Sequence, residues 1–402
     1  MDGKDTSSLL DLNRRNFTKG LLSIGLSASA AAGLSKEALA ELTDNPNEEV
    51  PRLGWYEIQN YEEIEKNGVP PEIKPKYYTI SRDKWVKTTA TEKASEQLAK
   101  RYTDSNISVG LVPHESKGIA VGVNYIVEES SDGKTKTPNV SFTEVQKQTP
   151  ANVSATVSTA DTEFTQTDIP ITVKRTKKQK EQTKCGEVTV ECHYEHKYDP
   201  IPAGCEAGTS ATSGCSWSLG PVAYSNKYNE YVILTAGHCV DSTGQSVYQP
   251  SRSNDYFGSV AEFGPDGMDS AVIEPYKRDV TMGIVDSGGG TRYPIKGMVS
   301  KTRINDMMEA GTGVYHTGRS TGDGYGQIDF HADNDDYPWM GYAISTAGGD
   351  SGSVTYDIVN DTDAYVVALH TGGYCSDGMK YGSGECMYSV EQEMNINYSS
   401  TL

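Results

Sequence analysis

Two short runs, about a hundred residues apart, carry the side chains that acyl-transfer chemistry needs. Thr235–Cys239 contains His238, and Gly348–Ser353 contains Ser351 between glycines. A serine hydroxyl becomes a nucleophile only when a neighbouring base takes its proton, and an imidazole suits that task. The glycines let backbone N–H groups turn towards the oxyanion that forms during acyl transfer. The two runs therefore predict hydrolysis through an acyl intermediate.

A histidine that acts as a base also needs a carboxylate to hold its tautomer. Asp269 lies between the two runs in the sequence and directly precedes the apolar run Ala271–Ile273, which could anchor it. Asp266 stands in the turn-like run Gly264–Gly267 and is better explained as a turn residue. We therefore expect a triad in the chain order His238, Asp269 and Ser351.

The segment that must position these residues has the residue pattern of a β protein. From about residue 200 onward, short β-rich runs such as Val232–Leu234 and Tyr365–Leu369 alternate with Gly, Ser, Asp and Asn. Many short strands with regular turn signals predict an all-β barrel or sandwich. Some 200 residues suffice for two small barrels with a cleft between them.

The order of the three residues and the runs around them resemble the chymotrypsin-like (trypsin-like) serine peptidases, especially the streptogrisin and alpha-lytic branch. The resemblance covers roughly residues 200–402. It implies a mostly β fold of two six-stranded Greek-key barrels and a serine endopeptidase that hydrolyses peptide bonds in protein or peptide substrates. It implies no cofactor and no metal. The alternative is a catalytically inactive member of this fold that binds a ligand or a surface.

The resemblance also implies how the oxyanion is bound. The backbone N–H groups of Gly349 and Ser351 would form the oxyanion hole. The family arginine that neutralises the buried aspartate beside the nucleophile is replaced here by His316. We therefore expect His316, or as a second choice Arg319, to pair with Asp350.

A further match is the strand that lines the substrate cleft, at Leu369–Gly373. By the resemblance, Thr371 would hydrogen-bond the Asp269 carboxylate. Gly372 and Gly373 would leave room for the substrate backbone to pair as an added strand.

The pocket for the substrate's P1 side chain involves His370 and Thr346. In the glutamyl endopeptidase branch, a histidine and a threonine or serine at these two places bind an acidic P1 side chain, and Gly352-Ser353 also matches that branch. An imidazole N–H and a hydroxyl can together satisfy a carboxylate. The alternative is that His370 is a buried strand histidine hydrogen-bonded to backbone. A preference for Glu or Asp at P1 is one of two open interpretations.

The chain has seven cysteines: Cys185, Cys192, Cys205, Cys215, Cys239, Cys375 and Cys386. The resemblance implies a disulfide between Cys215 and Cys239, beneath the catalytic histidine. Cys375 and Cys386 are the only two after the nucleophile, and we expect them to pair. If two of the other three cysteines form a disulfide, the third has no cysteine to pair with. A zinc site of Cys185, Cys192, His193 and His196 is the alternative, although an oxidising compartment favours a disulfide.

The N-terminus predicts export. Arg14 and Arg15 precede the apolar run Leu21–Leu26, and small residues follow up to Ala40. This pattern is typical of a twin-arginine signal peptide over residues 1–40; an amphipathic helix with two chance arginines is the alternative. No other run approaches the ~20 apolar residues that span a bilayer. We therefore expect a secreted protein without a membrane span. A net charge of −19 makes nucleic acid an improbable partner.

Between the signal and the barrels we expect two further segments. Residues 41–84 are rich in Pro, Glu, Asn and Lys and predict a linker. Residues 85–184 combine one helical pattern with strand-like runs and predict a small α+β module. The basic run Lys174–Lys184 predicts its boundary with the peptidase domain at 200–402. Such a module suits a pro-region that assists folding or inhibits the cleft; the alternative is an accessory domain that stays attached.

Overall fold

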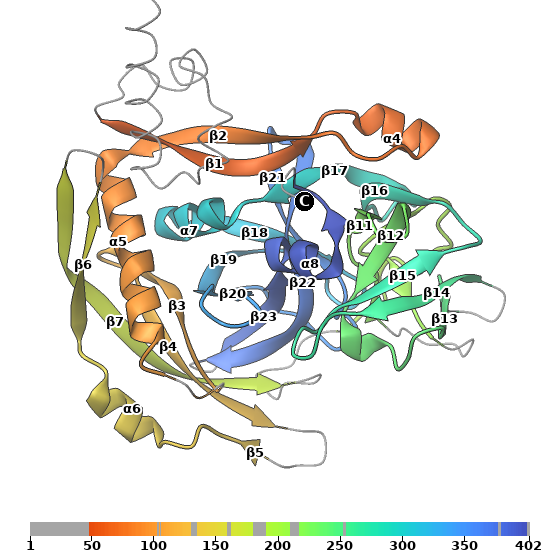
Figure 1. Cartoon of the computed structure of the whole chain (residues 1–402). Coiled ribbons are helices and arrows are strands. Elements are labelled where there is room, and N and C mark those ends of the chain that lie inside the picture. Colours follow the sequence, from red (N-terminus) through yellow and green to blue (C-terminus); the bar gives the residue numbers. More distant parts are fainter. Residues whose placement is uncertain are drawn as a thin grey trace, which may run out of the picture.

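A computed structural model describes residues 48–102, 104, 106–129, 135–158, 162–179, 190–209, 217–251, 255–376 and 379–399. The expected signal peptide lies outside these ranges, as do Cys185 and Cys215. The described chain is mostly β, as the sequence predicts (Figure 1). Among the described residues, no helix is both long and apolar enough to cross a membrane.

A closed barrel of six strands forms the C-terminal half. Its strands are β18 (Gly313–Gly318), β19 (Gly322–Ala332), β20 (Trp339–Tyr342), β23 (Met379–Cys386), β22 (Asp363–Ser376) and β21 (Val354–Val359). Each strand pairs antiparallel with the next, and β21 pairs with β18 to close the ring. Side chains such as Val314, Ile328 and Val367 are fully or almost fully buried in its core. Because side chains fill the interior of the barrel, a site can form only at the ends of its strands.

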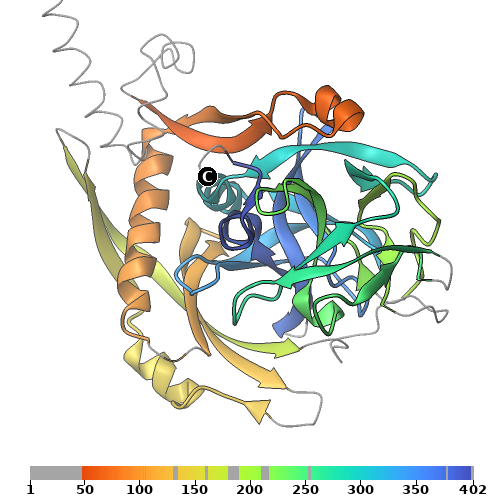
Figure 2. The same cartoon turned by 45° about the vertical axis from the view of Figure 1, so that its right-hand side comes forward.

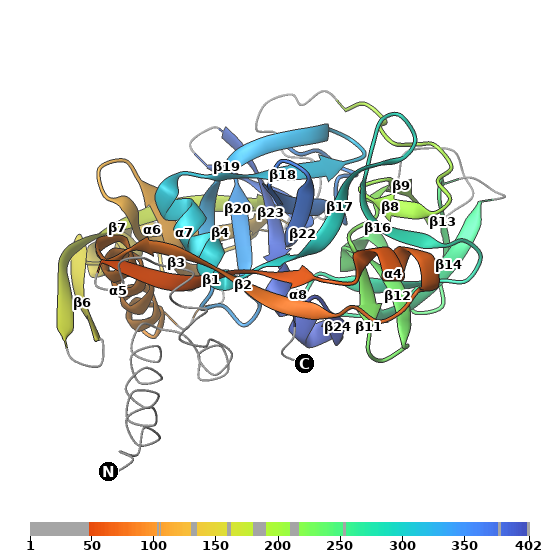
Figure 3. The same ribbon diagram turned by 90° about the horizontal axis from the view of Figure 1, so that it is seen from above.

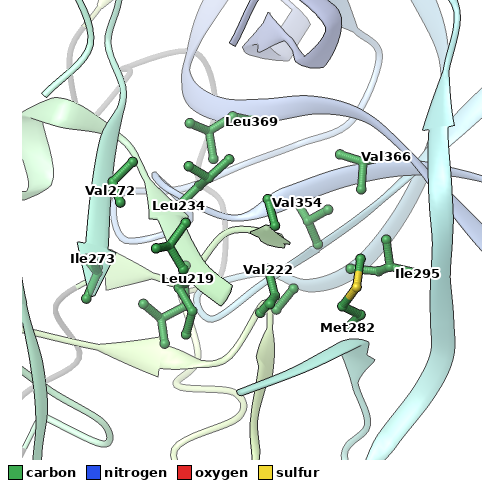
Figure 4. Packing of buried hydrophobic residues seen from close by; sticks show 14 of the residues in the cluster. Leu219, Val222, Leu234, Val272, Ile273, Met282, Ile295, Val354, Val366 and Leu369 are labelled. Carbon is green, nitrogen blue, oxygen red and sulfur yellow. The ribbon is translucent and has the colours of Figure 1, made fainter. Parts of the chain in front are cut away.

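A second six-stranded sheet forms the other half. Its order is β13 (Ser246–Tyr248), β14 (Tyr256–Phe263), β15 (Ala271–Pro275), β12 (Glu230–Thr235), β11 (Val222–Ser225) and β24 (Ile396–Asn397). Beside it lie β16 (Val280–Val285), β17 (Thr291–Val299) and the short strands β8 (Ile201–Ala203), β9 (Glu206–Ala207) and β10 (Trp217–Ser218). Figure 4 shows that Leu219 and Leu234 belong to the same apolar cluster as Val354 and Leu369 of the C-terminal barrel. This shared core fixes the two halves against each other.

The N-terminal module is an α+β unit with its own core, as predicted (Figure 2). Ser81 caps the N-terminus of helix α5 (Arg82–Ala99), and its side chain accepts a hydrogen bond from the Lys84 N–H. It packs on a sheet of β3 (Ile107–His114), β4 (Gly118–Glu129), β7 (Glu163–Gln179) and β6 (Asn152–Ser158). The fully buried Trp85 lies in this core. Strand β5 (Thr135–Lys136) and helix α6 (Phe142–Gln148) complete the unit.

The linker predicted over 41–84 is wrong from residue 48 onward. The chain there forms β1 (Glu49–Ile58), α4 (Tyr61–Asn67) and β2 (Ile73–Ser81), and β1 pairs with both β2 and β17. The hairpin extends from α5 to β16, where the Tyr61 hydroxyl donates to the Met282 carbonyl at 2.8 Å (Figure 3). Buried residues on β1 include Val50 and Ile58, and the polar residues that suggested a linker lie mostly at the surface.

Two further contacts join the module to the C-terminal barrel. Strand β3 pairs with β19 through Leu111 and His331, and the end of β7 pairs with β22. Two more helices, α7 (Lys301–Ala310) and α8 (Met387–Met394), lie on the barrel side of the molecule. The module therefore continues the sheet of the barrel.

Candidate active site

His238 and Asp269 come together because the strands before them are neighbours. His238 lies in the 3₁₀ turn Gly237–Cys239 directly after β12, and Asp269 precedes β15, which pairs with β12. His238 Nδ1 lies 2.7 Å from Asp269 Oδ2, and the His238 backbone N–H donates to Asp269 Oδ1 at 2.8 Å. With Nδ1–H donated to the carboxylate, Nε2 carries the lone pair that a general base uses.

Ser351 lies on a turn of the other half that packs against the end of β12. Gly352, next to the serine, has φ +88, and a Cβ there would lie 2.2 Å from Thr235 Oγ1 and 3.2 Å from the Ala236 nitrogen. The Ser351 carbonyl accepts from the Ser218 N–H at 3.0 Å. The structure thus brings the turn of Ser351 directly against the segment that carries His238.

The turn before the serine directs a backbone N–H away from the interior. The Gly348 carbonyl accepts from the Ser320 hydroxyl at 2.7 Å, and the Asp350 N–H donates to the Ala347 carbonyl at 3.1 Å. In a trans peptide the N–H points opposite to the carbonyl, so the Gly349 N–H points away from buried Ser320. The Gly349 φ of +98 suits the second central residue of such a turn.

Ser218 holds the same turn and has no signal in the sequence. Its hydroxyl donates to the Gly349 carbonyl at 2.9 Å and accepts from the Arg319 N–H at 3.0 Å. Ser218 is fully buried. It is 131 residues from Gly349 in the chain, so only the fold brings the two together.

The predicted pairing of Asp350 with His316 or Arg319 is wrong. In the described part of the chain, no cation lies within ion-pair distance of the buried Asp350. The carboxylate instead accepts from the N–H groups of Ser320, Thr321 and Ala347 at 2.7, 3.2 and 2.9 Å and from the Thr321 hydroxyl at 2.7 Å. The backbone after Gly318 wraps around the carboxylate, so these donors take the place of the family's arginine.

His316 is a buried neutral imidazole. Burial is the largest cause that lowers its pKa, and the charge of Asp350 opposes it. Its Nε2 lies 3.5 Å from the Ser353 hydroxyl, and its ring lies 4.8 Å from that of His370. It therefore packs beside His370 and Ser353 in the interior.

The two expected pocket residues, Thr346 and His370, are both buried. Thr346 is 2 % exposed, and its Oγ1 would lie 3.4 Å from a Cβ on Gly373. His370 is 1 % exposed, and its Nδ1 is hydrogen-bonded to the Tyr342 hydroxyl. The Thr355 hydroxyl donates to the same tyrosine oxygen at 3.0 Å. The His370 side chain thus bonds to a tyrosine, where the alternative interpretation had it bond to backbone.

The expected hydrogen bond from Thr371 to Asp269 does not form. The register between β22 and β23 shifts between His370 and Gly372, which leaves Thr371 as the irregular residue. Such an irregularity redirects a side chain. Both Asp269 oxygens are hydrogen-bonded to His238.

The edge expected to receive substrate is partly covered by the module. Gly373, Tyr374 and Cys375 of β22 pair antiparallel with Gln179, Lys178 and Lys177 of β7. The chain is described again from residue 190, where the Glu191 N–H donates to the Ser320 carbonyl and the His193 N–H to the Arg319 carbonyl. The module's last strand thus pairs with β22, and the start of the next segment bonds to the backbone of Arg319 and Ser320.

Two predicted disulfides are wrong. Cys386 is a buried thiol, and Cys375 is disulfide-bonded elsewhere. Cys375 pairs with Lys380 and Cys386 with Ala368, so the two cysteines lie at opposite ends of one hairpin. That separation is roughly 20 Å along the strands, whereas disulfides need Cα atoms within about 7 Å.

Cys239 is likewise a thiol, so its expected disulfide with Cys215 is not formed. Its Sγ lies 3.6 Å from the Ser351 carbonyl oxygen. Cys192 is disulfide-bonded, which removes it from the zinc alternative. Among the residues that the structure describes, no group of three or more His, Cys, Asp or Glu side chains could hold a metal ion.

Comparison with known proteins gives matches among solved structures alone. No family model and no curated protein matches the chain. A protease from Nocardiopsis is 19 % identical, with a TM-score of 0.38, and the match covers 50 % of this chain and 99 % of that one. Protease A from Thermobifida fusca is 20 % identical, with a TM-score of 0.37, over 50 % and 98 % of the two chains.

A third match is a glutamic acid-specific serine protease that is described as using a histidine triad in substrate binding. It is 16 % identical, with a TM-score of 0.38, over 49 % of this chain and 98 % of that one. All three are proteases, the class that the sequence resembles. Their identities are too low to carry an activity over to this chain.

Proposed function

We propose that this chain is a serine endopeptidase that hydrolyses peptide bonds through an acyl-enzyme. Ser351 is the nucleophile, His238 the general acid and base, and Asp269 the carboxylate that orients the imidazole. The observation that carries the proposal is the His238–Asp269 hydrogen bond of 2.7 Å, with the turn of Ser351 and Gly352 packed against Thr235 and Ala236, just before His238 in the chain. The N–H groups of Gly349 and Ser351 bind the oxyanion, and one such donor is typically worth ~10²–10³ in rate.

The test is reaction with a fluorophosphonate probe, which labels an activated serine. Wild-type protein is expected to be labelled, and Ser351→Ala is expected to lose the label. Ser353→Ala, which removes a buried hydroxyl two residues further on, is the matched control and should keep it. An unlabelled wild type would favour the catalytically inactive binding protein.

The preferred substrate, within this proposal, has an acidic P1 side chain. Thr346 offers a hydroxyl and His370 an imidazole N–H beside Gly373. Peptides that differ only at P1 should be cleaved faster after Glu than after Phe or Lys. Equal rates for all three would contradict this preference.

The N-terminal module, in this proposal, is an inhibitory pro-region. Its residues 177–179 pair with the edge of β22 where a substrate strand would bind. A cleavage site for a sequence-specific protease, placed between residues 179 and 190, tests this. Cutting there should raise the rate of probe labelling at least tenfold, and an unchanged rate would favour the accessory-domain alternative. Export by the twin-arginine route completes the proposal and is tested by blocking that route in the producing cell.

A further inference from the structure

The hairpin of β22 and β23 presents one face to Thr346. Gly373 and Gly382 are opposite each other on this hairpin. A Cβ on Gly382 would lie 3.1 Å from Thr346 Cγ2, and one on Gly373 would lie 3.4 Å from Thr346 Oγ1. Side chains on a strand alternate between faces, so residues two apart share one. Lys380, two residues before Gly382, therefore emerges on the face that borders the pocket.

Lys380 brings a positive charge without a partner in the described part of the chain. Its side chain is half-buried, and no described carboxylate lies within 4.0 Å of its ammonium group. Burial lowers its pKa, and the charge of Asp350 opposes that effect. A partly desolvated ammonium group of this kind is stabilised by any anion that enters the pocket.

The neutral groups of the pocket cannot supply that charge. The Tyr342 oxygen accepts from the Thr355 hydroxyl, and we assign its own O–H as the donor to His370 Nδ1, the other described partner of this hydroxyl. His370 is then the neutral tautomer with its proton on Nε2. Burial holds its pKa well below the usual value, and the neighbouring His316, His238 and Lys380 lower it further. A carboxylate bound by His370 and Thr346 alone would be hydrogen-bonded but not neutralised.

We propose that Lys380 is the charge partner of an acidic P1 side chain, with the Thr346 hydroxyl and the His370 Nε2–H as its neutral hydrogen-bond donors. This inference rests on the proposed peptidase function and names the residue that makes the pocket selective for a carboxylate. Lys380 acts on the substrate side chain and takes no part in the acyl-transfer step.

The test compares two peptides that are identical except for Glu or Gln at P1. Their shapes match, so the ratio of their kcat/KM values reports the charge alone. In Lys380→Met this ratio should fall at least tenfold, through loss of activity on the Glu peptide, while the Gln peptide stays within about threefold. Lys380→Arg should keep the preference. Lys277→Met, at an exposed lysine of the first half, is the charge-matched control and should change neither value.

The active fraction of every variant is counted with the fluorophosphonate probe. An unchanged ratio in Lys380→Met, or an equal loss on both peptides, would overturn the assignment. A wild type that is labelled but cleaves both peptides equally would overturn it as well and leave the peptidase proposal standing. A wild type without label would instead contradict the proposed function itself.

Discussion

Asp269 uses both carboxylate oxygens on the same residue. Oδ1 accepts from the His238 backbone N–H and Oδ2 from the ring Nδ1, so the carboxylate fixes where the histidine backbone lies and which tautomer the ring adopts. Asp269 itself precedes β15, whose first three residues are buried. Replacing one carboxylate oxygen of Asp269 by an amide nitrogen therefore has a definite expected effect.

We predict that Asp269→Asn lowers kcat by about 10⁴, as the equivalent change does in a well-studied triad. The amide places an N–H where Oδ2 accepted the Nδ1 proton, so the ring adopts the wrong tautomer. The measurement is kcat on a peptide substrate, with thermal unfolding as the check on folding. Asp266→Asn, in the preceding turn, is the control. A loss below tenfold would show that Asp269 does not orient the base.

The sequence predicts the triad residues because each stands in a short local run with its own chemistry. Ser218 and Tyr342 leave no such signal, because their roles depend on neighbours more than ten residues away. The Thr371 prediction fails at an irregularity of the β22–β23 register that residue types do not encode. The predicted Cys375–Cys386 disulfide fails because the order of cysteines in the chain does not show that they lie at opposite ends of a hairpin.

The contact of β1 with β17 depends on one glycine. Gly297 has φ +151, and a Cβ there would lie 1.8 Å from the Tyr56 carbonyl oxygen. A backbone atom cannot yield as a flexible side chain can, so the two strands must separate to admit a methyl group.

We predict that Gly297→Ala lowers the free energy of unfolding by about 2–4 kcal/mol, the range of strained or overpacked substitutions. It should also make the hairpin of β1 and β2 sensitive to limited proteolysis. Gly290→Ala, where nothing lies within 4 Å of the added atom, should change neither. Equal stability of the two variants in urea unfolding would show that β1 is not held at this point.

Helix α8 holds the end of the described chain through Glu391. Its Oε1 accepts from the backbone N–H groups of Tyr398 and Ser399, and the side chain is 4 % exposed. Burial is the main cause that raises the pKa of Glu391 to about 7. The folded protein therefore binds a proton that the unfolded chain has already released at mildly acidic pH.

We predict that this contribution to stability is complete below the unfolded pKa of about 4.3 and is lost as pH rises through 7. Glu391→Gln keeps the amide oxygen as an acceptor and removes the titration. It should match wild type at pH 4 and exceed it by about 3–4 kcal/mol at pH 8, from the linkage of a raised pKa. Denaturant midpoints at both pH values measure this. Parallel pH profiles for the two proteins would contradict it.

At the scale of the whole molecule, the module is bound through three strand pairings, to β17, β19 and β22. Charged contacts add to them: Arg52 bonds Asp306 at 3.2 Å, and Lys87 bonds Glu309 at 2.7 Å. The sequence predicts the mostly β barrels and the α+β module because their periodicity is local. It does not predict these pairings or the β1–β2 hairpin, because strands buried against another unit look polar in sequence.

We predict that the chain cuts itself after an acidic residue between β7 and residue 190. That stretch of the sequence contains two acidic residues, Glu181 and Glu187. Glu181 follows Gln179, the last residue paired with β22, by two positions. Mass spectrometry of purified protein should therefore find a new N-terminus at Gln182. Ser351→Ala should stay intact, and Glu181→Gln should slow cleavage at least tenfold. Cleavage that persists in Ser351→Ala would assign it to another protease.

The cover of the β22 edge by β7 also affects how the protein avoids aggregation. A strand edge that accepts a substrate backbone accepts any extended backbone, including that of a second, half-folded copy. Such an edge is most exposed while long-range strand pairs are still forming, when aggregation competes with folding. Strand β7 covers it within the same chain, at a local concentration that no neighbouring molecule can match. Expression of residues 190–402 alone should therefore give mainly insoluble protein.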